Sequence, residues 1–138
     1  MRADPTLNIA RQWIIKARND LLCADNNLAS SNVPCDTVCF HCQQAAEKIL
    51  KAALAAEGIP PPRTHILPVL AEQLVEMFPS VVELADELAA LTPYAIASRY
   101  PDDGDFLPTL SDALEARQFA ENVLLWVKDI LPMLTEET

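Results

Sequence analysis

The chain has 138 residues, of which 51% are hydrophobic and only two are glycine, and its formal net charge is −10. The length favours a single domain over residues 1–138, and the composition favours packed helices over disorder. A general binder of nucleic acid backbones needs a cationic surface, so the acidic balance excludes general DNA binding and leaves only a local basic pocket.

The sequence carries no signal for a membrane or for export. No apolar run reaches the roughly 20 residues that cross a bilayer. The N-terminus lacks the apolar segment of a signal peptide. We therefore expect a cytoplasmic protein without membrane contact, whose four cysteines are reduced thiols.

The first predicted helix begins at Asp4 and Pro5, with Asp as its cap and Pro in the first helical position. Helical spacing of apolar residues continues to about Ala29, and residues 30–34 break it. The core side comprises Ile9, Ala10, Trp13, Ile14, Ala17, Leu21, Ala24 and Leu28. Charged side chains fall mostly on the other side, namely Arg11, Lys16, Arg18, Asp20 and Asp25.

A second helix is predicted from a cap at Asp36 or Thr37 to about Glu57. Gly58 is its natural stop, and the prolines at 60–62 cannot continue a helix. In the first half of the chain, only the first predicted helix is longer than this one.

Shorter helices are predicted in the middle of the chain. One covers residues 66–78. Ser80 and Glu83 have the spacing of a capping box and open another helix to about Leu91. Residues 94–97 add a turn of helix.

The last predicted helix starts at Thr109 or Ser111, after an irregular stretch from 101 to 108. Its core side comprises Leu114, Phe119, Ala120, Val123, Leu124, Val127, Ile130, Leu131 and Leu134. Apolar surplus near Trp126 is the expected dimer contact. Since no segment alternates like a strand, we predict an all-α, antiparallel up-and-down bundle of about five helices.

Residues 39–54 organise the chain, because this part of the second helix has both an apolar and a polar side. Cys42, Ala45, Ala46, Ile49, Ala53 and Leu54 recur at spacings of three and four. The polar flank comprises His41, Gln44, Glu47, Lys48 and Lys51. Small residues on this helix allow another helix to come close.

This polar flank resembles the second-helix signature of the HEPN domain, a small helical domain. The residues that carry the resemblance are His41-x-Gln43-Gln44-Ala45-x-Glu47-Lys48-x-x-Lys51. Arg63-Thr64-His65-x-Leu67 is similar to the family's loop into the next helix, and Ser98-Arg99-Tyr100-Pro101 is similar to its Arg-Tyr-Pro element. The three pieces occur in the family's order between about Trp13 and Leu131. The resemblance implies the same helical bundle and a homodimer.

Many HEPN proteins are ribonucleases that use Arg, four to six intervening residues and then His near the start of the last long helix. In such a pair Arg holds phosphate and His moves a proton. This chain contains only His41 and His65, neither with Arg at that distance, and no His follows Arg117. The departure argues against an enzyme and leaves no assigned catalytic residue.

Lys48 and Lys51 are candidate ligand-binding residues, as phosphate contacts. The alternative is structural: Glu47 and Lys51, four residues apart, form a favourable surface pair, and Lys48 lies over core residues with its ammonium in water.

Arg63, His65, Arg99 and Tyr100 are the other candidate ligand-binding residues. Arg99 suits a bidentate phosphate contact and Tyr100 suits stacking on a base, while His65 titrates near neutral pH. Alternatively His65 caps the third helix and Arg99 ties its loop to a carboxylate such as Asp102.

No metal or cofactor is predicted. Cys35, Cys39 and Cys42 lie on one side of a helix, but a second ligand pair at zinc-site spacing is missing, so we interpret them as core residues. Asp102, Asp103 and Asp105 lack the calcium-loop pattern and indicate a solvated turn.

Two functions of different class follow. The resemblance implies a non-catalytic nucleotide-binding and/or interaction module that works with a minimal nucleotidyltransferase partner in a toxin–antitoxin-type pair. The alternative is a divergent, metal-independent ribonuclease toxin in which His65 or His41 replaces the usual His and Arg99 or Arg63 holds phosphate.

Overall fold

A computed structural model describes residues 5–95 and 107–136 of the chain. Within these ranges all regular secondary structure is helical and there is no strand, which confirms the predicted all-α bundle. Its α-helices are α1 (Pro5–Leu28), α2 (Cys35–Ala56), α3 (Leu67–Glu72), α4 (Ala85–Leu91) and α5 (Leu110–Ile130). Three 3₁₀ helices accompany them: η1 (Pro79–Leu84), η2 (Thr92–Ala95) and η5 (Pro132–Leu134).

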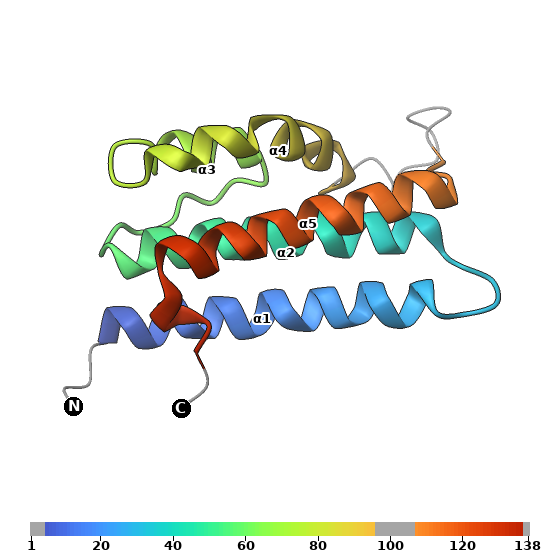
Figure 1. Ribbon diagram of the computed structural model, residues 1–138, viewed down its shortest axis with the longest axis horizontal. Helices are drawn as coiled ribbons and strands as arrows, with labels where there is room; N and C mark the ends of the chain where they lie inside the picture. Colours follow the sequence, from blue (N-terminus) through green and yellow to red (C-terminus); the bar gives the residue numbers. More distant parts are fainter. Residues whose placement is uncertain (1–4, 96–106, 137–138) are drawn as a thin grey trace.

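Helix α2 is the centre of the bundle. It packs most extensively against α1 and next against α5. Figure 1 shows these three long helices side by side, with the shorter α3 and α4 forming a layer along one edge. Ile49, Leu50 and Leu54 are fully buried. The alanines of α2 allow this close packing, and four of them are fully buried: Ala45, Ala46, Ala52 and Ala53.

The predicted end of α2 is confirmed and its predicted start is wrong. Gly58 has φ +73°, a left-handed conformation that glycine adopts without strain, and its N–H bonds back to the carbonyl of Ala55. At the other end, the helix begins at Cys35, directly after Pro34, and no side chain caps it. Asp36 instead lies in the first turn of α2, where its negative charge interacts favourably with the positive end of the helix dipole.

The middle of the chain is less regular than its sequence predicts. Of the residues 66–78 that were predicted as one helix, only those of α3 are helical, and the chain then forms a turn. The capping box predicted at Ser80 and Glu83 is wrong, because η1 begins at Pro79 without a side-chain cap. The Ser80 hydroxyl instead accepts a hydrogen bond of 3.0 Å from the indole N–H of Trp126.

Helix α5 starts with its cap at Thr109, one of the two predicted start residues, and ends before Leu134, the last residue predicted on its core side. Thr109 Oγ1 accepts from the Asp112 N–H at 3.1 Å, and the Thr109 N–H donates to Asp112 Oδ2 at 2.8 Å, so Thr109 is the cap. The helix ends at Ile130, because Pro132 has no N–H with which to continue it.

Trp126 itself is not part of an exposed apolar surface, although the adjacent Leu125 is 51% exposed. The Trp126 side chain is 8% exposed and its ring meets that of Phe78 edge to face, with centroids 6.4 Å apart. The indole therefore connects α5 to η1 and to Phe78, which directly precedes η1. Among the described residues, no helix has the length and apolar character that crossing a membrane requires.

Candidate functional site

The polar flank of α2 lies between α1 and the connection from α2 to α3. Two buried carboxylates form its centres: Asp20, from α1, is 7% exposed and Glu47, from α2, is 4% exposed. Burying a carboxylate is costly unless cations and hydrogen-bond donors compensate its charge. Each carboxylate here has a lysine and a histidine as partners.

The first group, the Asp20 cluster, joins α1 to α2. Nδ1 of His41 lies 2.8 Å from Asp20 Oδ1, and the Lys48 ammonium lies 2.6 Å from Asp20 Oδ2. The side chains of His41 and Lys48 are 25% and 23% exposed, so their outer edges reach solvent. This ion pair is one reason why a carboxylate is tolerated on the inner side of α1.

The second group, the Glu47 cluster, holds the connection after α2. The Lys51 ammonium donates to Glu47 Oε2 at 3.0 Å, and Nδ1 of His65 lies 2.8 Å from Oε1. The Gln43 amide donates to the same Oε1 at 3.2 Å and to the backbone carbonyl of His65 at 3.1 Å. Lys51 also lies over the Trp13 ring, 5.7 Å from its centroid.

The Glu47 cluster favours the ionised carboxylate. Burial by itself raises the pKa of Glu47, but the hydrogen bonds from His65, Lys51 and Gln43, together with the Lys51 charge, outweigh burial and lower it. An ionised Glu47 only accepts hydrogen bonds, so Nδ1 of His65 carries the proton between them. The other ring nitrogen of His65 remains available, since this side chain is 59% exposed.

The sequence pattern of the HEPN domain family matches residues 10–130, which is most of the chain. The chain belongs to the HEPN domain family. This membership supports a nucleotide-related or RNase-like module in general. Searches of curated proteins and of solved structures found no match.

The HEPN signature on α2 is largely a structural network in this chain. Every polar residue of the signature bonds to a described side chain: His41, Gln43, Gln44, Glu47, Lys48 and Lys51. Within the described part of the chain, no buried side-chain nitrogen or oxygen lacks a hydrogen-bond partner. The signature thus fixes α1 and the following connection to the central helix.

Several predicted site residues therefore have a different environment from the one expected. The Glu47–Lys51 pair exists but is buried, not on the surface, since Lys51 is only 9% exposed. His65 does not cap α3, because the cap position belongs to Ile66 and the His65 ring binds Glu47. Lys48 reaches only partly into solvent and pairs with Asp20.

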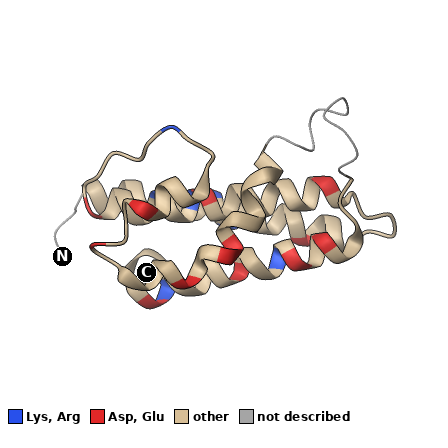
Figure 2. Ribbon diagram, turned by 90° about the horizontal axis from the view of Figure 1, so that it is seen from above, with Lys and Arg blue, Asp and Glu red and all other residues tan. Residues whose placement is uncertain are grey.

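Arg63 is the predicted site residue that stays most available. It is exposed and forms no hydrogen bond or ion pair with a described residue. In the sequence Arg63 is the basic residue between α2 and α3, and Figure 2 shows how acidic positions (red) outnumber basic positions (blue) along the helices. Arg99 and Tyr100 lie outside the described residues, as do Asp102, Asp103 and Asp105, for which a solvated turn was predicted.

The sequence did not predict the roles of two residues in the Asp20 and Glu47 clusters. Asp20 was assigned to the outer side of α1, and Gln43 was not considered a candidate. A signal for Asp20 was present, because it lies three residues after Ala17 and four before Ala24, both of which are buried on the core face of α1. A charged residue on a core face indicates a partner across the interface.

The cysteines pack as buried apolar groups or stay as surface thiols. Cys39 and Cys42 are fully buried, and burial raises the pKa of each to about 12. Such thiols remain protonated, whereas metal binding and nucleophilic attack need the thiolate. Cys23 is exposed and all four cysteines are free. No group of three or more His, Cys, Asp or Glu in the described ranges has the arrangement of a metal site.

Proposed function

We propose that this HEPN domain is a non-catalytic nucleotide-binding and/or interaction module that works with a minimal nucleotidyltransferase partner in a toxin–antitoxin-type pair. The observation that carries the proposal is the family match over residues 10–130 in a chain without the Arg, four-to-six-residue, His pattern of its catalytic relatives. Without this pair, the chain lacks the residues that would hold phosphate and move the proton in that chemistry.

The candidate nucleotide site combines Arg63 with the exposed ring of His65, and Arg99 and Tyr100 stay candidates from the sequence alone. Arg63 has its guanidinium available for a phosphate, and Glu47 fixes the orientation of His65 beside it. Lys48 contributes charge from a partly exposed position, while the Lys51 charge is neutralised inside the Glu47 cluster. We further propose a cytoplasmic homodimer, in keeping with four free thiols.

A thermal-shift screen with ATP, other nucleotides and short RNAs tests nucleotide binding. A ligand at a hundred times its dissociation constant stabilises the folded state by about 2.7 kcal/mol. We expect a shift for wild type that is reduced in Arg63→Ala and in Arg99→Ala. Lys128→Ala is the matched control, because it removes one exposed cation from α5. Equal shifts in all three variants would place the ligand elsewhere.

The partner arm of the proposal needs a separate measurement. Co-expression with a minimal nucleotidyltransferase, followed by gel filtration, should give a complex of defined stoichiometry. The absence of such a complex, together with no shift for any nucleotide, would contradict the proposed function as a whole.

A metal-independent ribonuclease remains the second candidate, and the two histidines favour it. Each places Nδ1 on a buried carboxylate and so directs the other ring nitrogen away from the cluster, an orientation that suits an acid or base. The test is RNA cleavage in EDTA by wild type, lost in His65→Ala or His41→Ala variants that keep their helical circular dichroism. Intact RNA after long incubation with dimeric protein would end this candidate.

A further inference from the structure

A second surface lies on the outer side of α1 and is defined by four residues, Arg11, Ile15, Arg18 and Leu22, called here the α1 stripe. Their spacings of four, three and four bring them onto one face of the helix. The two apolar members are unusually exposed, at 59% for Ile15 and 57% for Leu22. Cationic and apolar side chains therefore alternate along more than three helical turns.

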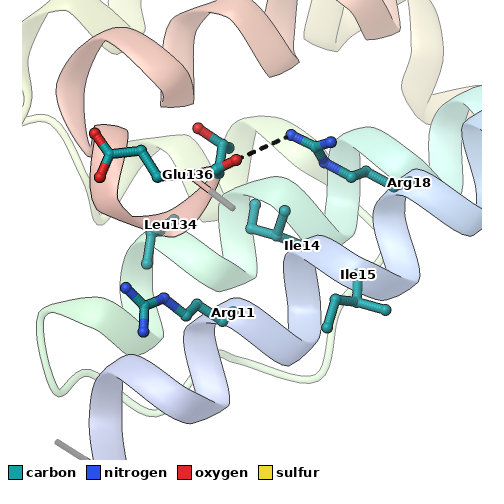
Figure 3. A pocket seen from close by; sticks show the side chains of 7 residues that line it. Arg11, Ile14, Ile15, Arg18, Leu134 and Glu136 are labelled. Carbon is teal, nitrogen blue, oxygen red and sulfur yellow. Dashed lines mark hydrogen bonds between the residues drawn. The ribbon is translucent and has the colours of Figure 1, made fainter. Parts of the chain in front are cut away.

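Three of the four stripe residues, Arg11, Ile15 and Arg18, line an open groove of about 460 Å³ between α1 and the C-terminal turn that contains η5. In Figure 3, Ile14, Ile15 and Leu134 lie between the two arginine side chains, which extend from α1 toward the C-terminal turn. The groove thus has an apolar floor and a guanidinium toward either end. Its size is in the range that binds ligands.

Both guanidinium groups keep most of their hydrogen-bonding capacity. Arg11 Nε donates to the Met133 carbonyl at 3.1 Å, and Arg18 Nη2 donates to the Thr135 carbonyl at 3.4 Å. Each of these bonds uses one of the five N–H donors of an arginine and neutralises no charge. The arginines position the C-terminal turn and remain able to bind an anion.

The charge of the stripe is not compensated by nearby described residues. Neither Arg11 nor Arg18 forms an ion pair with any described carboxylate, including Glu136, which also lines the groove. Between Pro5 and Asn19, α1 contains no Asp or Glu. A cationic helix face on a chain of net charge −10 directs an acidic partner to this side of the molecule.

We propose that the α1 stripe and its groove bind an acidic amphipathic helix of a partner protein. Arg11 and Arg18 are seven residues apart, which is about 10 Å along the axis, too far for one phosphate or carboxylate to contact both. A helix with carboxylates at i and i+7 and apolar side chains between them matches both the charges and the apolar floor. Such a helix would extend its apolar side over Leu22.

This inference does not rest on nucleotide binding. Arg18 and Asp20 are two residues apart and so face opposite sides of α1. The stripe therefore lies on another side of α1 from Asp20, and no member of the Asp20 or Glu47 cluster lines its groove. Failure of nucleotide binding would leave this proposal intact, and the reverse also holds.

The probe for the test is a synthetic, fluorescein-labelled helical peptide with Glu at i and i+7 and Leu at i+4 and i+11. Fluorescence polarisation in low salt should show saturable binding to wild type that weakens as salt screens the charges. Arg18→Glu and Leu22→Ser should each weaken binding at least about tenfold. Lys16→Glu is the matched control, because Lys16 is an exposed cation on another side of α1.

A charge-exchanged peptide guards against variants that simply misfold. With Lys in place of its two Glu residues, the peptide should bind Arg11→Glu/Arg18→Glu and not wild type. No binding of the original peptide, or equal weakening by Lys16→Glu, would overturn the proposal. So would displacement of the peptide by millimolar inorganic phosphate, which would indicate a small-anion site. A changed oligomeric state of Arg18→Glu in sedimentation would assign the stripe to a second copy of this chain.

Discussion

Glu47 is the residue on which most interactions of the candidate site converge. Its two oxygens accept from the Lys51 ammonium, the His65 ring and the Gln43 amide, with the carboxylate 4% exposed. Removing one member of a buried ion pair leaves the other charge uncompensated, which costs more than the pair contributes. The energetic role of this glutamate is therefore to allow Lys51 and Gln43 to be buried.

Glu47→Gln should lower the free energy of unfolding at pH 7 by about 3 kcal/mol, because Lys51 would keep its charge without a counter-charge. Urea denaturation followed by circular dichroism measures this. Glu57→Gln, the same change on an exposed side chain at the end of α2, should alter stability by less than about 0.5 kcal/mol. Equal effects in the two variants would contradict the assigned role.

The same substitution has a pH dependence of defined sign. The native pKa of Glu47 lies below its ordinary value of 4.5, so folding favours the ionised form. Its contribution is complete above about pH 4.5 and is lost as the pH falls through the native pKa. The stability difference between wild type and Glu47→Gln should therefore shrink in acid.

At this scale the sequence singled out polar residues that the structure brings together, but it did not predict their surroundings. Lys48, Lys51 and His65 were candidates because of their charge, and all three belong to the carboxylate clusters. Whether a lysine faces solvent or a buried partner depends on which helix packs against it. Asp20 comes from another helix, and because it lies 28 residues from Lys48, no local spacing rule could have paired the two residues.

The helices agree with the local sequence patterns wherever no contact with a distant residue replaces the predicted local interaction. Periodicity predicted α1, α2 and α5 because each buries one long face, and Gly58 ended α2 as expected. The Ser80–Glu83 capping box failed because Pro79 starts a 3₁₀ helix and Trp126 uses the Ser80 hydroxyl. A sequence pattern cannot show that a hydroxyl has a better partner 46 residues away.

The start of α5 provides a test at the level of one element. Thr109→Ala should reduce stability by about 1 kcal/mol, since it removes the hydroxyl that accepts from the Asp112 N–H, one of the two bonds of the capping box. Ser111→Ala, two residues further along at an exposed position, should change stability by less than about 0.5 kcal/mol. Thermal unfolding of the two variants side by side measures the difference. A larger loss of stability for Ser111→Ala than for Thr109→Ala would mean that Ser111, and not Thr109, caps the helix.

The whole molecule combines an internally neutralised core network with an acidic surface. Inside, the Asp20 and Glu47 clusters pair every buried charge that the structure describes. Outside, residues 67–91 carry acidic and no basic side chains, whereas the exposed cations of the described chain are Lys16 and Arg18 on α1, Arg63, and Lys128 on α5. This separation leaves two surfaces that attract anions on an otherwise repulsive molecule, which is what the nucleotide and acidic-helix proposals require.

The acidic surface should also make the stability of the whole protein depend on salt. A net charge of −10 destabilises the compact state through self-repulsion, and salt screens exposed charges more than buried pairs. We therefore expect the melting temperature at pH 7.5 to rise between 20 and 200 mM NaCl. A gain of about 1 kcal/mol corresponds to roughly 3–5 °C for a domain of this size. Choline chloride should act like NaCl if screening is the cause, whereas a rise with sodium alone would indicate a specific cation. A fall in melting temperature with both salts would mean that the exposed ion pairs of Arg117 with Asp25 and Glu121 outweigh the surface repulsion.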